Sequence, residues 1–92
     1  VFCINYLSKE QKFLVDRFFD RNGPKGADRF ADVPTAPLST GAPGILGAVG
    51  TLDCAVEEVI SRHGTQIVIG RLIDAAQDFS LAPLVSFGGK IT

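Results

Sequence analysis

The chain opens with a stretch whose residue pattern changes partway along: Phe2-Cys3-Ile4-Asn5-Tyr6-Leu7-Ser8-Lys9-Glu10-Gln11. Its first six residues are mostly aromatic, β-branched or apolar, which predicts a strand over residues 2–7 that is covered on both faces except at Asn5. An amide on such a strand needs hydrogen-bond partners, because a buried polar group without one is costly. The backbone of a neighbouring loop is the simplest expected partner for Asn5.

A helix is predicted to follow, from Lys9 to Asp20. Ser8 and Gln11 have the spacing of a capping box, in which each side chain bonds the other residue's backbone amide. Apolar residues then recur at helical spacing as two pairs, Leu14/Phe18 and Val15/Phe19. The charged residues are expected mostly on the solvent side: Lys9, Glu10, Lys12, Asp16 and Arg17. The sequence Asn22-Gly23-Pro24 ends the helix.

The rest of the chain indicates strands. Prolines and glycines interrupt residues 21–44, which predicts a surface loop with at most a short turn at 28–30. Residues 45–60 alternate as one long strand, a second strand covers 66–75, and a turn at 62–65 joins them. The double acid Glu57-Glu58 breaks the alternation and predicts a bulge. A short strand is expected at 84–87. The predicted fold is therefore mainly β, a piece of a β-barrel with one helix.

Alternation also predicts which side chains of the long strand are buried. Its inward set is Leu46, Ala48, Gly50, Leu52, Cys54 and Val56. Its outward set, expected to be solvated or to face a partner, is Val49, Thr51, Asp53, Ala55 and Glu57. Cys54 should then be an unreactive core thiol.

Composition excludes several classes of protein. In 92 residues, 9 Lys and Arg stand against 10 Asp and Glu, and 46% of residues are hydrophobic. A near-neutral, apolar-rich chain fits neither a nucleic-acid binder nor a disordered tail. We expect no membrane segment, and two cysteines without paired spacing predict neither a disulfide scaffold nor a zinc site, so a cytoplasmic location is expected. The single histidine, His63, fits a hairpin tip and no metal site.

Several motifs in fixed order resemble the short-chain flavin reductases, the flavin mononucleotide-binding split barrels that serve two-component monooxygenases. The opening stretch, continued by Asp16-Arg17-Phe18, resembles the family's phenylalanine-x-valine-asparagine-x-leucine-serine-x-x-glutamine block. The further matches are Lys25-Gly26-Ala27-Asp28-Arg29-Phe30 before Val33-Pro34, Gly47-Ala48 before Leu52-Asp53-Cys54, Ile67-Val68-Ile69-Gly70, and Pro83-Leu84-Val85. The resemblance spans nearly all of residues 1–92.

The resemblance implies an NAD(P)H-dependent flavin reductase that supplies reduced FMN or FAD to a partner monooxygenase. Because the flavin carries the chemistry, such a protein needs to hold two rings face to face, and no catalytic acid, nucleophile or metal ligand is expected. The flavin-side candidates that it implies are Asn5, Ser8, Gln11, Arg29 and Phe30. The nicotinamide-side candidates are Thr65, Gln66 and Lys90.

Two departures from the family pattern leave an alternative open. Thr65 stands where the family tends to carry a histidine, and Ile91 stands where an aromatic residue is usual. The alternative function is a non-enzymatic split-barrel module that binds flavin or dimerises. Ser8 and Gln11 are also explained by capping alone, and the basic stretch 21–26 by a solvated loop.

Two expectations concern assembly. Apolar positions such as Leu46, Leu52, Val56, Ile67 and Ile69 exceed what the chain can cover, which favours a homodimer whose interface borders the flavin site. Phe79 and Phe87 are expected in a core or an interface. The chain also has no methionine and begins inside a strand. We therefore expect residues 1–92 to be the C-terminal part of one split-barrel domain and, alone, to be inactive.

Overall fold

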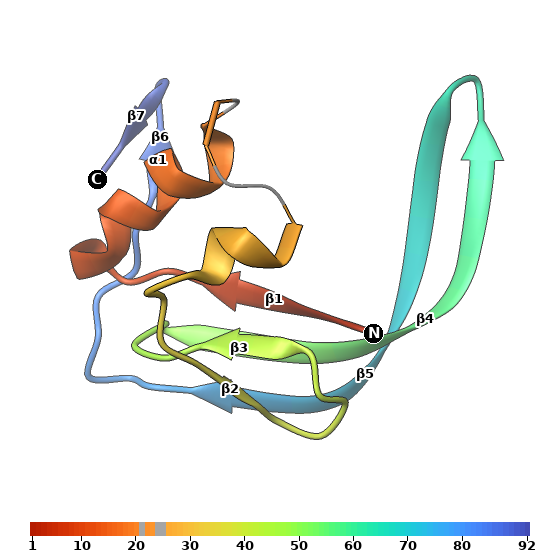
Figure 1. Ribbon diagram of the computed structural model, residues 1–92, viewed down its shortest axis with the longest axis horizontal. Helices are drawn as coiled ribbons and strands as arrows, with labels where there is room; N and C mark the ends of the chain where they lie inside the picture. Colours follow the sequence, from red (N-terminus) through yellow and green to blue (C-terminus); the bar gives the residue numbers. More distant parts are fainter. Residues whose placement is uncertain (21, 24–25) are drawn as a thin grey trace.

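The computed structural model describes residues 1–20, 22–23 and 26–92. Its helices are short: η1 (Lys9–Gln11, 3₁₀), α1 (Lys12–Phe19) and η2 (Gly26–Phe30, 3₁₀). Its strands are β1 (Phe2–Tyr6), β2 (Thr35–Pro37), β3 (Pro43–Ile45), β4 (Gly50–Arg62), β5 (Thr65–Gln77), β6 (Ser86–Phe87) and β7 (Lys90–Ile91). The mainly β fold with one α-helix is confirmed (Figure 1).

The main sheet has the antiparallel order β1-β4-β5. Strand β1 pairs with β4 from Phe2 opposite Cys54 to Tyr6 opposite Gly50. Strands β4 and β5 continue together to Arg62 opposite Thr65, where His63 and Gly64 form the turn with φ angles of 50° and 79°. Two positive φ angles are what a two-residue hairpin turn requires, so the predicted turn at 62–65 is confirmed.

The far half of this hairpin, residues 56–70, projects from the rest of the molecule, and we call it the arm (Figure 1). The arm begins just beyond the N-terminal end of β1, because Phe2, the first paired residue of β1, lies opposite Cys54. The pairing shifts by one residue between Val56 and Glu58, which confirms the predicted bulge. A bulge bends a strand and increases its twist, so the sequence Glu57-Glu58 marks the base of the arm.

A small core lies beneath α1 and consists of Leu14, Val33 and Ile45, with Leu7, Phe18 and Phe30 packed against it. The predicted helix over 9–20 is present, although its first turn is 3₁₀ and it ends at Phe19. The capping interaction is present through Gln11, whose Oε1 accepts from the Ser8 amide at 3.1 Å. Arg17 is half-buried, which corrects its expected place on the solvent side.

At the base of the arm, the ring of Phe2 packs over Gly70. A Cβ atom at residue 70 would lie 2.6 Å from the Phe2 ring, closer than such atoms approach. Any larger residue at this position would push the Phe2 ring aside, so glycine is what permits the close packing.

The prediction of a loop through residues 21–44 was incomplete, because the segment contains β2 and β3. These strands pair as a short hairpin that ends with Pro37 opposite Pro43. Proline suppresses a strand prediction, yet it is tolerated at a sheet edge where no amide donor is needed. The basic stretch 21–26 lies partly outside the described residues. The strand predicted at 84–87 is present as the shorter β6, and β7 was not predicted.

The expected long strand over 45–60 was wrong at its start and in part of its burial pattern. Residue 45 ends β3, and β4 begins only at Gly50. Thr51 and Asp53 are buried although they were expected outward, whereas Leu46 and Val56 are exposed. The reason is that the β2–β3 hairpin covers the face of β4 that carries Thr51 and Asp53, as the bonds from Ser39 and Thr40 to Asp53 show. Cys54 is buried, as predicted.

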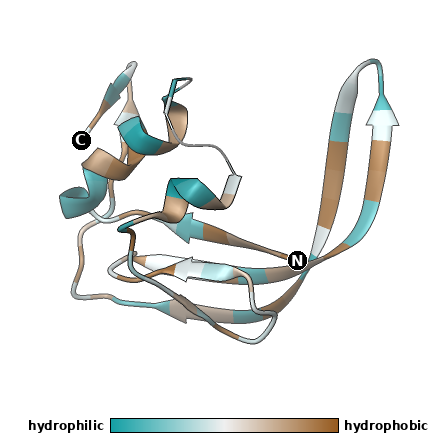
Figure 2. Ribbon diagram, viewed as in Figure 1, coloured by the Kyte–Doolittle hydropathy of each residue, from teal (hydrophilic) through white to brown (hydrophobic). Residues whose placement is uncertain are grey.

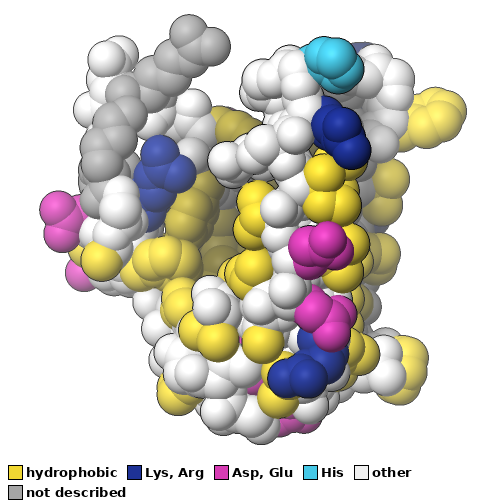
Figure 3. Space-filling view, turned by 90° about the vertical axis from the view of Figure 1, so that its right-hand side faces the viewer, with side chains coloured by type: hydrophobic (Ala, Val, Ile, Leu, Met, Phe, Trp, Pro, Cys, Tyr) yellow, Lys and Arg dark blue, Asp and Glu magenta, His cyan; other side chains and the backbone are white. Residues whose placement is uncertain are grey.

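The arm is apolar and exposed. Bands of hydrophobic residues run along both of its strands (Figure 2). Val56, Val59, Val68 and Ile69 are each 40% to 50% exposed. Seen end-on, the arm stands apart from the helical part of the molecule across a hollow in which hydrophobic side chains are visible (Figure 3).

Candidate functional site

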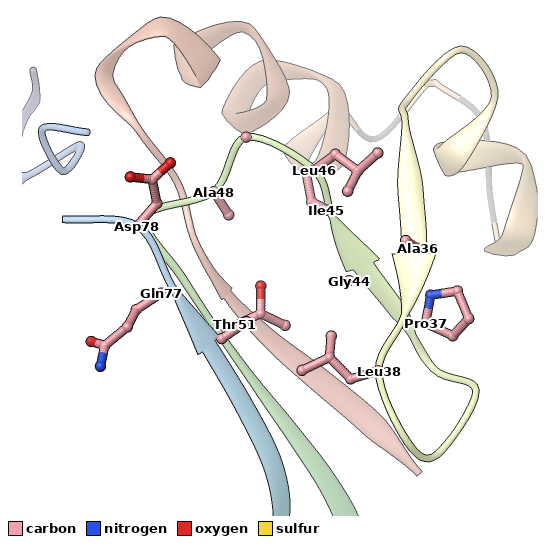
Figure 4. A pocket seen from close by; sticks show the side chains of 12 residues that line it. Ala36, Pro37, Leu38, Gly44, Ile45, Leu46, Ala48, Thr51, Gln77 and Asp78 are labelled. Carbon is pink, nitrogen blue, oxygen red and sulfur yellow. The ribbon is translucent and has the colours of Figure 1, made fainter. Parts of the chain in front are cut away.

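The first pocket, which we call the front pocket, lies between the β2–β3 hairpin and the start of the β4–β5 hairpin (Figure 4). Its volume is about 260 Å³, and much of its wall is the segment 44–48. Small residues such as Ala36, Ala48 and Ala76 line it, so backbone is close to any occupant. Its polar side chains are Thr51, Gln77 and Asp78. A flat ring with a few polar atoms matches this chemistry.

Asn5 holds one end of the wall. Its Oδ1 accepts from the Ile45 amide at 3.0 Å and from the Thr51 hydroxyl at 2.9 Å. Its Nδ2 donates to the Pro43 carbonyl oxygen at 3.5 Å. The expectation that this amide bonds a neighbouring loop's backbone is confirmed. One side chain from β1 thus fixes the positions of β3 and β4 relative to each other.

Gln11 holds the other end of the wall. Its Nε2 donates to the Leu46 carbonyl oxygen at 2.8 Å, while its Oε1 accepts from the Ser8 amide. Both ends of the carboxamide are therefore used, and the side chain is buried. Gln11 connects the start of the helix to the segment 46–48. The helix cap and the pocket wall share one residue.

Ser8 is buried at the junction of three elements. Its carbonyl oxygen accepts from the Gln11 amide at 2.9 Å, and the residue bridges to Pro83. The neighbouring Lys9 amide donates to the Ala82 carbonyl oxygen at 3.0 Å. Ser8 therefore packs the start of the helix against the C-terminal segment.

Behind the wall lies a second pocket of about 280 Å³, which we call the rear pocket. Helix α1, β1 and η2 enclose it, and its lining is apolar apart from Asn5 and Cys3. Phe30 belongs to this lining and meets Phe18 edge-on, with ring centroids 5.1 Å apart. A third pocket of about 420 Å³ continues from it toward β6 and β7, and shares Asn5, Leu7, Val15 and Phe19 with it.

The carboxylate of Asp53 anchors the turn between β2 and β3. It accepts from the Ser39 and Thr40 amides at 2.8 and 2.9 Å and from the Thr40 hydroxyl at 2.5 Å. The Thr40 hydroxyl bond, together with the two amides, lowers the pKa of Asp53, although burial opposes this shift. Asp53 was expected to be solvated or to face a partner; its side chain is in fact fully buried.

Cys3 contributes to the same network. Its Sγ donates to Asp53 Oδ1 at 3.5 Å and to the Ala42 carbonyl oxygen at 3.6 Å. Burial, followed by the hydrogen bond to Asp53, raises the pKa of the Cys3 thiol to about 11. A thiol with such a pKa is not a nucleophile at neutral pH, so Cys3 is a structural donor.

Asp78 lies at the end of β5 beside the front pocket. Its Oδ1 accepts from the Ser80 hydroxyl at 2.5 Å and from the Ser80 amide at 2.9 Å, and these bonds lower its pKa. A carboxylate that stays ionised repels anions. This end of the pocket therefore disfavours a negatively charged group.

The structure does not bring all the sequence-predicted residues together. Asn5, Ser8 and Gln11 cluster at the start of the helix, and Phe30 lies across the rear pocket from Asn5. Arg29 precedes Phe30 in η2. Thr65 and Gln66 are exposed at the arm tip, whereas Lys90 is exposed in the β6–β7 hairpin on the other side of the molecule (Figure 1). One chain therefore offers a clustered flavin-side set and a divided nicotinamide-side set.

Sequence reasoning missed the lining of the front pocket. Thr51, Gln77 and Asp78 come from the start of β4 and the end of β5, and only the pairing of these strands brings them together. The only available signal was the glycine-rich run before Leu52, which the structure shows to be the turn and wall at 44–50.

Two further observations concern the described residues. Within residues 1–20, 22–23 and 26–92, no group of three or more His, Cys, Asp or Glu side chains could hold a metal ion. None of the helices in that part of the chain is long and apolar enough to cross a membrane.

Comparison with known proteins gives a consistent result. The family model described as "Flavin reductase like domain" matches residues 1–92. The chain is 33% identical, over 91% of its length, to the flavin-dependent monooxygenase reductase subunit HsaB of Mycobacterium tuberculosis, and covers 41% of that protein. It is also 33% identical, over 98% of its length, to the FMN reductase (NADH) RutF 2 of Methylorubrum extorquens, and covers 51% of it.

A solved structure shares the fold. The NADH:FAD oxidoreductase SgcE6 of Streptomyces globisporus matches 98% of this chain with a TM-score of 0.83 and 27% identity, and the chain covers 54% of it. The chain thus spans about half the length of the relatives that it matches.

Proposed function

The chain belongs to the flavin reductase-like domain family, and from this membership we propose that the protein containing it transfers hydride from NADH to a flavin. The observation that carries the proposal is the match of the family model to all 92 residues. The names of the relatives support NADH as the donor and either FMN or FAD as the acceptor. The flavin, when bound, supplies the redox chemistry.

The front pocket is our proposed place for the flavin ring. Its small side chains and exposed backbone fit a flat ring, and the Thr51 hydroxyl and the backbone at 44–48 offer polar atoms for the ring's edge. A volume of about 260 Å³ lies slightly below the ~300 Å³ lower end of usual ligand pockets. The ring would therefore fill it, and the rest of the flavin would lie outside.

We propose that Asn5 and Gln11 act on the flavin indirectly. Both carboxamides are already hydrogen-bonded to the backbone of the wall at 44–48, so they fix that backbone in place. Ser8 supports Gln11 in this role. Phe30 lines the rear pocket behind this wall, so we propose that it too acts on the flavin indirectly, together with its neighbour Arg29 in η2. Because hydride transfer depends on the relative placement of two rings, a small shift of this wall would lower its rate.

For the nicotinamide side we propose Thr65, Gln66 and Lys90, contributed by different copies in a homodimer. Their separation within one chain supports a shared site, and the exposed apolar arm supports association. The name of the Mycobacterium tuberculosis relative supports a monooxygenase as the consumer of reduced flavin. The two free thiols support a cytoplasmic location.

The test is a kinetic assay of the full-length protein. We expect oxidation of NADH that requires added flavin, with FMN and FAD compared side by side. A flavin-binding protein that leaves NADH unconsumed would instead support the non-enzymatic module, which the departures from the family pattern at Thr65 and Ile91 also favour. Absence of flavin binding would contradict both functions.

Light scattering tests the homodimer. A dimer at micromolar concentration is expected for the unsubstituted protein, and Val68→Asp and Ile69→Asp on the arm should weaken it. A monomer under the same conditions would contradict this part of the proposal.

A further inference from the structure

Arg17 occupies an unexpected position in the last turn of α1. Its helical spacing places it among the charged, solvent-facing residues, but its side chain is half-buried. The guanidinium Nε donates to the Arg29 carbonyl oxygen at 2.9 Å, and Nη2 donates to the Ala31 carbonyl oxygen. One side chain thus binds two backbone carbonyls at the end of η2.

This pair of bonds fixes η2 against α1. Phe18, the next residue along α1, meets Phe30 of η2 through the edge-on ring contact described above. Two consecutive residues of α1 therefore hold consecutive parts of η2, one by charge-assisted hydrogen bonds and one by ring packing. The carbonyls at a helix end carry partial negative charge, which a cation stabilises.

This pair of hydrogen bonds is specific to arginine. A guanidinium presents its donors in a rigid planar fork, so it can reach two carbonyls separated by one residue. A lysine ammonium is a point donor and would satisfy one of them at most in this geometry. Substitution by lysine therefore keeps the charge and removes half of the interaction.

The segment that Arg17 holds bears two of the flavin-side residues. Arg29 is itself the residue whose carbonyl is bound, and Phe30 packs against the core cluster that contains Ile45, a residue of the front-pocket wall. We infer that Arg17 is a positioning residue that sets flavin affinity by fixing η2 behind this wall. This inference rests on the proposed function, because it needs a flavin at the adjoining site.

The experiment compares three variants of the full-length protein with the unsubstituted one. Arg17→Ala removes both bonds, Arg17→Lys removes one, and Lys12→Ala removes an equal charge from an exposed position on the same helix. Flavin affinity is measured by fluorescence titration, and the KM values for flavin and NADH are measured separately. Hydrogen exchange reports on residues 26–33.

We expect Arg17→Ala to raise the flavin Kd and flavin KM about tenfold, the loss that ~1.4 kcal/mol of binding free energy produces. The KM for NADH and the kcat at saturating flavin should stay unchanged, because the segment does not touch the nicotinamide candidates. Arg17→Lys should fall between Arg17→Ala and the unsubstituted protein. Exchange over 26–33 should be faster in Arg17→Ala, and Lys12→Ala should change nothing.

Other outcomes overturn the inference. A less stable Arg17→Ala protein with an unchanged flavin Kd would show that Arg17 only stabilises the fold. Equal changes in both KM values and in kcat would show general damage. If Arg17→Ala does not fold, an unchanged flavin Kd in Arg17→Lys overturns the inference equally well.

Failure of the proposed function is distinguishable from these outcomes. If the unsubstituted protein binds no flavin, the proposed function falls, and so does the claim about flavin affinity. Hydrogen exchange over 26–33 would still show whether Arg17 holds η2.

Discussion

The two halves of the β4–β5 hairpin are paired along their whole length, with register shifts at Asp53/Cys54 and Val56/Glu58, but they differ in burial. In the near half of β4, Thr51, Asp53 and Cys54 are buried. In the arm, Val56 and Val59 of β4 and Ile67 and Val68 of β5 are about half exposed. Strand β1 and the β2–β3 hairpin lie against the near half, and in the described part of the chain β1 reaches the arm only at its base, where Phe2 packs over Gly70.

This difference shows that strand sequence alone does not determine burial. Both halves carry β-branched and apolar residues in pairs, which suits a covered sheet. Among the described residues, cover is provided for the near half and not for the arm beyond its base. The arm has the composition of a buried element and the surroundings of a surface one, a combination typical of an interface.

The largest expected difference between the two regions concerns apolar truncation. Leu14→Ala, in the core beneath α1, should lower the free energy of unfolding by about 3 kcal/mol, because it leaves a cavity. Val68→Ala, on the arm, should lower the free energy of unfolding of the monomer, in which the arm is exposed, by less than about 0.5 kcal/mol. Urea denaturation measures both. Equal losses would show that the arm is covered.

The buried carboxylate of the near half gives the next largest effect. Asp53→Asn replaces one of the two carboxylate oxygens with an NH2 donor, so the two bonds accepted by that oxygen are lost and the bonds to the remaining oxygen lose their charge. We expect the melting temperature to fall by roughly 10 °C. Asp16→Asn, at an exposed position on α1, is the matched control. A small change in Asp53→Asn would mean that the turn is held by other contacts.

A smaller loss is expected at Gln11. Gln11→Ala removes the bonds to the Ser8 amide and the Leu46 carbonyl, and should cost about 1 kcal/mol of unfolding free energy. Lys12→Ala, one residue along, should be neutral. The same Gln11 variant should weaken flavin binding in titration, because the pocket wall loses its tie to the helix. Tight binding by Gln11→Ala would separate the wall from the flavin site.

The smallest predicted effect is a pH dependence of the near half. The Thr40 hydroxyl and two amides hold the pKa of Asp53 below its ordinary value of 3.8. A carboxyl whose pKa is lower in the folded state stabilises the fold at neutral pH. That stabilisation is lost as the pH falls from about 4 through the lower folded value. Denaturation midpoints between neutral pH and pH 2 should decline less in Asp53→Asn than in the unsubstituted protein.

Sequence patterns found the features that depend on near neighbours in the chain. The capping pair Ser8 and Gln11, the bulge at Glu57-Glu58 and the turn at His63-Gly64 are each set by a few adjacent residues. Local steric and hydrogen-bonding preferences are sufficient for such features. This is why the helix, the bulge and the turn were predicted correctly, whereas the start of the first long strand was not.

The errors occur where a distant segment supplies the cover. Asp53 alternates like an outward residue, and only the return of Ser39 and Thr40 over the sheet buries it. Arg17 was predicted to be solvated because helical spacing does not show the carbonyl groups that it binds, which lie outside the helix. In the site, sequence marked Asn5 as needing partners but could not name Ile45 and Thr51. The periodicity of a sequence predicts in which direction a side chain points, but not which distant segment packs against it.

The contact between Phe2 and Gly70 has a consequence for how this domain can vary. Since a Cβ at residue 70 would lie 2.6 Å from the Phe2 ring, a larger residue there requires either a shift of that ring or a smaller side chain at residue 2. The two positions, far apart in the sequence, are therefore coupled in the side-chain sizes that they accept. In a collection of related sequences, they should covary in size, and the double substitution Phe2→Leu with Gly70→Ala should be better tolerated than Gly70→Ala alone.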